Sequence, residues 1–474
     1  MNTSFVIRGA MVIDGTGVDR YAADVEVDNG VIHAIIPAGG ESKFETFDGI
    51  GLILAPGFID AHTHDDVLVI EGQSPHPKLS QGVCTVVTGN CGISVAPLQS
   101  DNPPPPLDLL GTEAFKYASF AKYLAGIDEA KPAVNVVPLV GHTTTRVKHV
   151  GDLSRPANKA EITAMCDEIS EALDAGAFGL STGVYYPPAR AADTAELLGV
   201  CSALKGRNAM LTMHLRDEGG AIEASMKEAF EVGIACDARL VLSHHKVVGV
   251  SNYGRTKQTL AMIDEAAKQQ SVCMDCYPYD ASSTMLDAEK ATFVSDVLIT
   301  WSKPFPETAG KRLQTIADEL VLSLFDAAKK LMPGGAIYFG MSPEDVDRVL
   351  QHPLTMVGSD GLPHDLKPHP RLWGSFPRVL SHHSRERGLL SLESAIHKMT
   401  GFTAKRFGLK NRGQISAGFA ADLVLFDAAL VKDNATYANP TEPTSGIHAV
   451  FVNGELALRN GELINSHAGK RLIP

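Results

Sequence analysis

The chain lacks the features that would place it in a membrane or on a nucleic acid. No apolar run approaches the roughly 20 residues of a membrane span. The first residues show no basic region followed by a long apolar core, so we expect no signal peptide. Basic residues are in the minority, 42 against 55 acidic ones, which leaves a formal charge of −13. Because that field repels phosphates and anionic lipids, we expect neither a nucleic-acid nor a membrane partner.

Cysteine is also scarce: the chain has seven cysteines, an odd number, and they are scattered along the sequence. Such a set favours reduced thiols over a disulfide framework, and hence a cytoplasmic protein. Cys273 and Cys276 have the CxxC spacing of redox and metal motifs, but they stand in a strand-like run. We therefore favour buried structural thiols at these two positions.

The rest of the composition is that of an ordinary globular protein, with 44% hydrophobic and 20% charged residues. A length of 474 residues suits one large domain and a smaller one. Both ends of the chain are β-rich, at residues 4–13 and 23–36 and again at 421–426. We predict a small β-domain built from residues 1–55 and 410–474, beside a central α/β body.

The central body, residues 56–409, alternates eight short apolar runs with helical patterns. The runs lie at 57–62, 84–91, 134–142, 178–184, 210–214, 239–244, 272–278 and 354–360. The clearest helices are 159–175, between a possible Asn158 cap and Gly176, and 256–269. This alternation predicts a (β/α)8 TIM barrel in preference to a doubly wound open sheet, because reactive side chains stand at the C-terminal ends of the runs.

The connection between the seventh and eighth runs, about 279–353, is longer than a simple crossover. It contains helical stretches at 308–331 and Pro/Gly punctuation. A long loop at the catalytic end of a barrel is typical of a lid. We expect a lid-like insertion here, with an ordinary surface excursion as the alternative.

Metal-ligand side chains stand where several runs end. His62 and His64 are two residues apart in an extended segment, so both imidazoles point to one face. In a barrel the ends of all eight strands meet at one rim, where such residues gather. The set is His62, His64, His214, either His244 or His245, and Asp360, with Cys91 at the end of the second run.

Imidazole nitrogen, carboxylate oxygen and thiolate sulfur are together the ligands of zinc. Zinc lowers the pKa of a bound water from about 16 to about 7, which makes hydroxide available at neutral pH. A neighbouring carboxylate can take the proton and pass it to a leaving amine. Asp360 fits that catalytic role, so the set predicts a metal-dependent hydrolase.

Five segments carry a closer resemblance to a known family. They are AHTHDD at 61–66, GNCG at 89–92, SHHK at 243–246, YPY at 277–279 and SDG at 359–361. Together they resemble the N-acyl-D-amino-acid deacylases (D-aminoacylases) of the amidohydrolase superfamily, over nearly the whole chain. The resemblance implies a zinc-dependent enzyme whose partner is a small molecule, an N-acyl-D-amino acid, which it hydrolyses to a carboxylate and a free D-amino acid.

The resemblance also implies how the metal is held. Many superfamily members bridge two metals with a carboxylated lysine on the fourth strand, but the run 178–184 has no lysine. The resemblance assigns the bridging position to Cys91; a buried inert thiol and a nucleophilic thiol are the alternatives. The implied tight zinc is held by Cys91, His214 and His244. The implied second site, weak or optional, is formed by His62, His64 and Asp360 and shares Cys91.

Two further histidines stand close to this set. His245 is the alternative to His244, which we prefer because Lys246, two residues on, shares its facing in an extended segment. His142, at the end of the third run, is either a support for the site or a core histidine.

An N-acyl amino acid carries an α-carboxylate, which needs fixed cations in a chain of net negative charge. The resemblance makes Lys246, Tyr277 and Arg371 the carboxylate clamp and adds Ser283. Lys290 could meet an acidic side chain of the substrate, or it could be a solvated charge paired with Glu289. With Met341 as a possible wall of an apolar pocket, we lean towards neutral, apolar D-amino acids.

Three other functions fit parts of this pattern. A dipeptidase acting on L-Xaa-D-Xaa is an alternative, because a peptide bond is also an N-acyl group. A cyclic amidase of hydantoinase or dihydroorotase type shares the fold and the histidines but usually has the bridging lysine. The non-enzymatic alternative is a catalytically silent scaffold with this fold, against which the complete ligand set argues.

Overall fold

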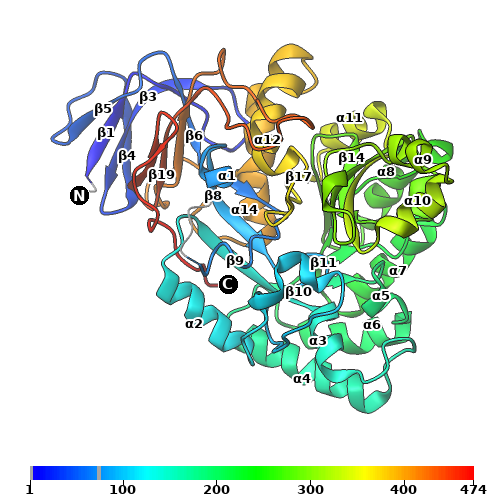
Figure 1. Cartoon of the computed structure of the whole chain (residues 1–474). Helices are drawn as coiled ribbons and strands as arrows, with labels where there is room; N and C mark the ends of the chain where they lie inside the picture. The colour runs from blue at the N-terminus through cyan, green and yellow to red at the C-terminus, as the bar shows by residue number, and fades with distance from the viewer. Residues whose placement is uncertain (1–3, 72–75) are drawn as a thin grey trace.

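A closed parallel barrel forms the centre of the fold in this computed structural model, which describes residues 4–71 and 76–474 (Figure 1). Residues 1–3, where the predicted β-domain begins and no signal peptide is expected, lie outside them. The barrel strands are β7 (Phe58–Asp60), β8 (Val83–Thr88), β9 (Asn135–Gly141), β10 (Gly179–Gly183), β11 (Met210–His214), β12 (Arg239–Leu242), β13 (Val272–Cys276) and β17 (Thr355–Val357).

The eight strands pair in parallel in the order β7-β8-β9-β10-β11-β12-β13-β17. The first and last strands are joined by hydrogen bonds from the Ala61 N–H to the Val357 oxygen (3.2 Å) and from the Asp360 N–H to the His62 oxygen (2.8 Å). Parallel strands are covered on both faces, so they appear in the sequence as continuous apolar runs. Each predicted run coincides with one barrel strand, although β8 begins one residue before the predicted 84, and the predicted (β/α)8 barrel is confirmed.

Helices cover the outside of the barrel. They are α1 (His76–Leu79), α2 (Phe120–Ala130), α3 (His142–His149), α4 (Lys159–Ala175), α5 (Pro187–Arg190), α6 (Thr194–Cys201), α7 (Ile222–Ala235), α8 (Thr256–Ala266), α11 (Pro343–Gln351), α12 (Arg371–Arg378), α13 (Leu392–Met399) and α14 (Gly401–Phe407). Helix α4 has the predicted bounds, because the Asn158 side chain caps its first N–H groups and Gly176 ends it at φ 117°. Helix α8 ends three residues before the predicted 269.

A ten-stranded sheet contains strands from both ends of the chain, as predicted. Its strands are β1 (Phe5–Arg8), β2 (Met11–Val12), β3 (Tyr21–Asp28), β4 (Val31–Pro37), β5 (Glu45–Asp48), β6 (Ile53–Pro56), β18 (Leu423–Phe426), β19 (Ile447–Val452), β20 (Glu455–Arg459) and β21 (Glu462–Leu463). The two ends meet where β6 and β18 pair antiparallel, with Leu423 opposite Pro56. The turn between β3 and β4 is Asn29-Gly30, both at positive φ, as a two-residue hairpin requires.

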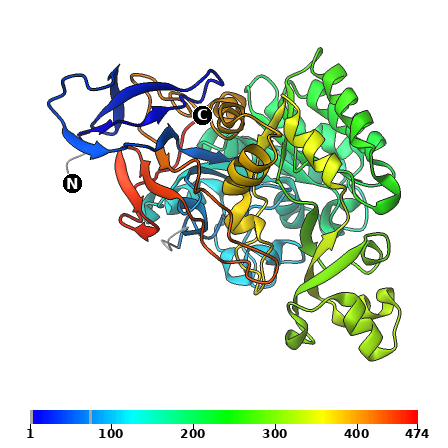
Figure 2. The ribbon, with the colours of Figure 1, turned by 90° about the horizontal axis from the view of Figure 1, so that it is seen from above.

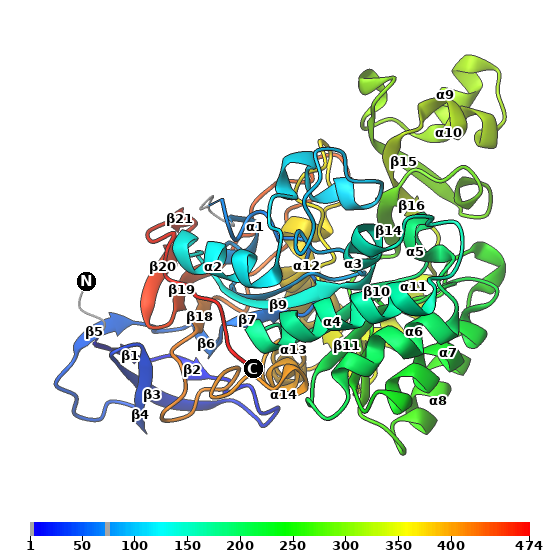
Figure 3. The same cartoon turned by 90° about the horizontal axis from the view of Figure 1, so that it is seen from below.

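The connection between β13 and β17 carries a small separate sheet. Its strands, β14 (Ala281–Met285), β16 (Gly334–Phe339) and β15 (Asp296–Ser302), pair antiparallel in that order. Helices α9 (Leu313–Leu320) and α10 (Leu324–Leu331) pack on this sheet through an apolar cluster of their own. Figures 2 and 3 show the α9–α10 end projecting from the barrel, on the side away from the ten-stranded sheet. No helix among residues 4–71 and 76–474 combines the length and hydropathy needed to cross a membrane.

A candidate metal centre at the barrel rim

Three histidines and one cysteine meet inside the rim. The Cys91 Sγ lies 3.3 Å from the Nε2 of His62 and 3.3 Å from the Nε2 of His244. The same His244 nitrogen lies 2.9 Å from the Nδ1 of His214. These side chains follow strands β7, β8, β11 and β12 or end them, and all four are buried.

The remaining two predicted ligands complete the cluster. The Asp360 Oδ1 lies 3.5 Å from the Nε2 of His62 and 3.2 Å from the Nε2 of His64. Asp360, Cys91 and His244 have positive φ, at 50°, 55° and 37°. Residues other than glycine rarely adopt this region, and such backbones concentrate at functional sites. The structure therefore brings all six predicted residues into one continuous set of contacts.

The loop that carries Cys91 is held by the neighbouring strand β10. The Ser181 hydroxyl accepts a hydrogen bond from the Gly92 N–H (2.9 Å) and donates one to the Gly89 oxygen. A Cβ at Gly183 would collide with the Cys91 carbonyl oxygen. A glycine in β10 thus gives the loop the close approach that directs Cys91 into the rim.

The charges of the cluster suit a cation. Burial opposes ionisation of the Cys91 thiol, but His62, His244 and His214 together hold its pKa well below the ordinary value. Burial likewise opposes ionisation of Asp360, but Arg371 and His62 hold the pKa of that carboxyl well below the ordinary value. His62, Cys91, His244 and Asp360 each offer one ligand atom, and these four atoms lie within 4.8 Å of one another. A thiolate, imidazoles and a carboxylate at this spacing fit a zinc ion.

Glu218 belongs to the site, although it was not predicted from the sequence. Its Oε1 lies 3.1 Å from the His244 Nδ1 and 2.6 Å from the Lys246 Nζ. Its Oε2 lies 3.8 Å from the His214 Nε2. A carboxylate on the outer nitrogen of a ligand histidine fixes the ring and its tautomer. The signal available in the sequence was an acid four residues after His214.

Asp275, in strand β13, contacts two histidines of the cluster and was also not predicted from the sequence. Its Oδ1 lies 3.3 Å from the His62 Nδ1 and accepts the His244 N–H at 2.9 Å. It stands between Cys273 and Cys276, which are buried free thiols, as expected. Burial raises their pKa values to about 11 and about 12, so neither is a reactive thiolate.

Lys78 is a third residue that was not predicted from the sequence. It lies where the first and last barrel strands, β7 and β17, meet. The Lys78 Nζ donates to the Asp60 Oδ2 and to the Ser359 hydroxyl, both at 2.8 Å, and lies 3.5 Å from the Asp65 Oδ2. The Asp60 Oδ1 in turn accepts the Ser359 N–H at 2.8 Å. This buried network ties β7 to the segment that carries Asp360.

The four predicted clamp residues lie side by side next to the cluster. The Arg371 Nη1 lies 2.9 Å from the Asp360 Oδ2, and its Nη2 donates to the Ser283 carbonyl oxygen at 3.1 Å. The Arg371 guanidinium lies 4.5 Å from the Tyr277 ring centre, and the Lys246 Nζ lies 6.0 Å from it. The Tyr277 hydroxyl and the Arg371 Nε are buried without a hydrogen-bond partner among the described residues. These groups are disposed to receive an anionic ligand.

The two further histidines named from the sequence, His245 and His142, lie outside the cluster. The His245 Nε2 lies 2.9 Å from the Thr259 hydroxyl, so His244 and not His245 faces the cluster. The His142 Nε2 lies 3.3 Å from Glu196, in a buried network with Arg146. Neither histidine joins the cluster.

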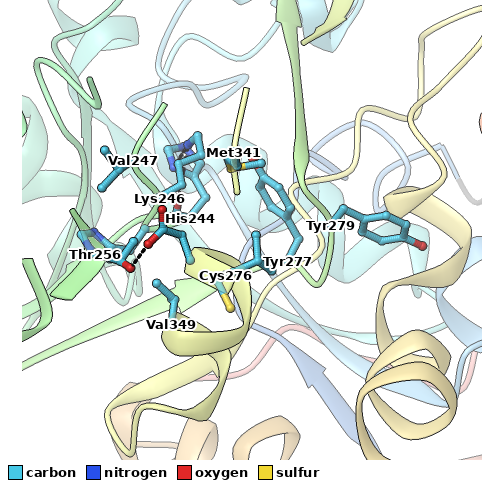
Figure 4. Close-up of a pocket in the computed structure, with 12 residues that line it drawn as sticks. His244, Lys246, Val247, Thr256, Cys276, Tyr277, Tyr279, Met341 and Val349 are labelled. Atoms are coloured by element: carbon cyan, nitrogen blue, oxygen red, sulfur yellow. Dashed lines mark hydrogen bonds between the residues drawn. The ribbon is translucent and has the colours of Figure 1, made fainter. Parts of the chain in front are cut away.

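A small cavity is lined by Lys246 and by His244 of the cluster (Figure 4). Its volume of about 10 Å³ is room for one water molecule at most. Tyr277 and Met341 pack together at its edge, whereas the Tyr279 ring points away. Met341 therefore belongs to the same apolar cluster as Tyr277, which is one of the predicted clamp residues.

Comparisons with known proteins agree with this geometry. A model of the Amidohydrolase family matches residues 45–292 and 226–457. A D-aminoacylase of Alcaligenes xylosoxydans xylosoxydans is 47% identical over 468 residues, 98% of this chain and 97% of the relative. An N-acyl-D-aspartate deacylase of the same organism is 51% identical over 452 residues, 95% of this chain and 91% of the relative.

A solved structure shows the same fold throughout. It is an N-acyl-D-glutamate deacylase from Bordetella bronchiseptica, complexed with zinc and a phosphonate inhibitor. It has 42% identity and a TM-score of 0.96, and the match covers 100% of both chains. This chain belongs to the amidohydrolase family, in the branch of the D-aminoacylases and N-acyl-D-amino-acid deacylases.

Proposed function

We propose that this chain hydrolyses N-acyl-D-amino acids to a carboxylate and a free D-amino acid with the help of zinc. The observation that carries the proposal is the position of the carboxylate clamp directly beside the ligand cluster, joined through the 2.9 Å contact between Arg371 and Asp360. Relatives named for this activity cover nearly the whole chain. The seven free cysteines fit our expectation of a cytoplasmic protein.

Cys91, His214 and His244 are the proposed ligands of a tight zinc. A second, optional zinc would be held by His62, His64 and Asp360 and would share the Cys91 thiolate. Bound zinc supplies a polarised carbonyl and a water of lowered pKa. A thiolate bridge provides the negative charge that a carboxylated lysine provides elsewhere.

Asp360 is the proposed general base and acid. Its low pKa keeps it ionised at neutral pH, and its Oδ1 faces the two histidines of the first strand. It takes a proton from the attacking water and delivers that proton to the amide nitrogen. The amine then leaves as the free D-amino acid.

The clamp residues orient the amino-acid half of the substrate. Arg371 and Lys246 bring two fixed cations, and the Tyr277 hydroxyl brings a donor that is buried without a partner among the described residues. A carboxylate held by such groups places the scissile amide over the ligand cluster. Ser283 lies at the same edge, because its carbonyl oxygen accepts from Arg371.

The surroundings of Lys290 favour an acidic substrate side chain over the neutral one that the sequence suggested. Lys290 is buried, and its Nζ faces the rings of Tyr338 (4.7 Å) and Tyr185 (5.7 Å). It forms no ion pair within the described residues, with Glu289 or any other acid. It lines a cavity of about 230 Å³ together with Glu218, the partner of Lys246. A buried unpaired cation beside the clamp suits the side-chain carboxylate of D-aspartate or D-glutamate.

The test compares N-acetyl-D and N-acetyl-L forms of Asp, Glu and Met, with zinc quantified in the same samples. We expect hydrolysis of the D forms, with the acidic substrates ahead of Met. Equal hydrolysis of L forms, or of an L-Xaa-D-Xaa dipeptide in preference, would contradict the proposal. A protein that stays inert with zinc bound would favour the scaffold alternative.

The role of Asp360 has its own test. We expect Asp360→Asn to keep the tight zinc and to lose at least a hundredfold in kcat, because the amide cannot accept the proton. Near-normal turnover by this variant would remove Asp360 from the mechanism.

A further inference from the structure

A groove runs along the seam between the barrel loops and the insertion; its larger cavity is apolar, and its smaller cavity is also lined by charged side chains, Arg190, Asp287, Glu289 and Lys329. It consists of two adjoining cavities of about 360 and about 660 Å³. The residues that line both cavities are Pro187, Met285, Leu286 and Met332. The larger cavity is completed by Pro104, Pro105, Leu153, Ser154, Pro188 and Pro333. We call this feature the seam groove; in its larger cavity Ser154 is the one polar residue.

The inner end of the seam groove touches the site. Tyr186 and Thr284 line the smaller cavity, and their hydroxyls lie 3.2 Å apart. The Tyr186 ring lies 5.0 Å from the ring of the proposed ligand His214, centre to centre. Thr284 directly follows the clamp residue Ser283. The groove is therefore continuous with the walls of the site.

The barrel topology places the barrel wall of the groove across from Lys246, Tyr277 and Arg371, whereas its other wall, with Met285 and Leu286, continues from β14, the strand of Ser283. Lys246, Tyr277 and Arg371 follow strands β12, β13 and β17. The groove's barrel wall comes from the loops after β8, β9 and β10. In the order of the closed barrel these two sets of three strands lie opposite one another, with the ligand cluster between them.

A secondary amide is trans, so the acyl carbon chain and the amino-acid Cα leave the C–N bond on opposite sides. If the clamp holds the α-carboxylate and the carbonyl lies over the cluster, the acyl chain points to the seam groove. We propose that the seam groove binds an unbranched alkyl chain, so that the substrates are N-acyl-D-amino acids with medium-chain acyl groups and not acetyl alone. This inference rests on the proposed function and adds the class of acyl group.

The test is a series of N-acyl-D-glutamates from acetyl through butanoyl and hexanoyl to octanoyl. Each methylene buried in an apolar site strengthens binding by about fourfold. We expect kcat/KM to rise at least tenfold from acetyl to octanoyl. A flat or falling series, with the acetyl substrate still hydrolysed, would overturn the groove and leave the proposed function standing. Hydrolysis of no chain length would overturn both.

Variants with a charge in the seam groove then test whether the dependence of kcat/KM on acyl-chain length arises there. Met332 is 42% exposed at the outer groove, so Met332→Asp is compatible with folding and puts a carboxylate where the chain would lie. We expect the octanoyl-to-acetyl ratio of kcat/KM to fall about tenfold in Met332→Asp and also in Leu153→Asp, on the opposite wall. Val321→Asp, 90% exposed on the same insertion, is the matched control and keeps the wild-type ratio. An unchanged ratio in both groove variants would refute the assignment.

Discussion

The buried ion-pair network of Lys78 allows a test of how much the contact between the first and last barrel strands contributes to stability. Lys78 and Asp60 are both 0% exposed, and their ion pair measures 2.8 Å. Replacing Lys78 with Met leaves the Asp60 and Asp65 carboxylates buried without their cation. Breaking a buried pair from one side costs about 3–5 kcal/mol, against about 0–1 kcal/mol for a surface pair. We expect Lys78→Met to lower the free energy of unfolding by about 3–5 kcal/mol.

The assay is urea unfolding of the chelated protein, so that metal binding does not add to stability. Lys148→Met is the matched control, because Lys148 lies 2.6 Å from Glu168 but is 30% exposed; its cost is expected to stay below about 1 kcal/mol. The double variant Lys78→Met/Asp60→Asn removes one of the buried carboxylates that lack a cation. It is therefore expected to recover part of the lost free energy of unfolding. Equal costs for the two lysine variants, or no recovery in the double variant, would show that the network does not act through charge burial.

Three further outcomes follow from the site. Dialysis against a chelator abolishes hydrolysis and added zinc restores it, as metal analysis and activity assays in parallel will show; activity without metal would contradict the ligand assignment. The Glu218 carboxylate orients His244 and Lys246, so the Glu218→Gln variant is expected to lose about ten- to hundredfold in zinc affinity or activity. The control variant Glu223→Gln, which removes a carboxylate from an exposed ion pair, is expected to change neither. Burial lowers the pKa of Lys290 to about 8, so its charge is present below that pH and lost above it. The kcat/KM ratio of N-acetyl-D-Glu to N-acetyl-D-Met therefore falls as pH rises through about 8, and the Lys290→Met variant shows a flat ratio.

The barrel was predictable because each of its strands is buried along its length. Strand β8, for example, is buried at all six positions, and its sequence, Val-Cys-Thr-Val-Val-Thr, is largely apolar. Local rules also placed α4, whose capping residues are adjacent in sequence to the ends of the helix. The ligand set followed from the same logic, because in a barrel the ends of all strands share one rim.

The supporting residues were not predictable in this way. Lys78 and Ser359 are 281 positions apart, and no local pattern connects them. The sheet of the insertion was missed although β15 and β16 contain apolar segments; of its three strands, β14, Ala-Ser-Ser-Thr-Met, has no apolar run. The helical stretch 308–331 is divided into α9 and α10, with Val321 at φ 56° between them. For β14 in particular, antiparallel pairing with β16 and not a local apolar pattern accounts for the strand.

Strand β6 ends at Pro56, yet its partner β18 begins at Leu423. While the ribosome synthesises the barrel, the edge of β6 is bare, and an exposed strand edge invites pairing with other chains. A nascent chain therefore carries an unfinished sheet until almost its last residues emerge. A chain shortened before position 423 would retain its proposed ligands and still expose this edge, so shortening at the carboxyl end is expected to cause aggregation before it affects catalysis.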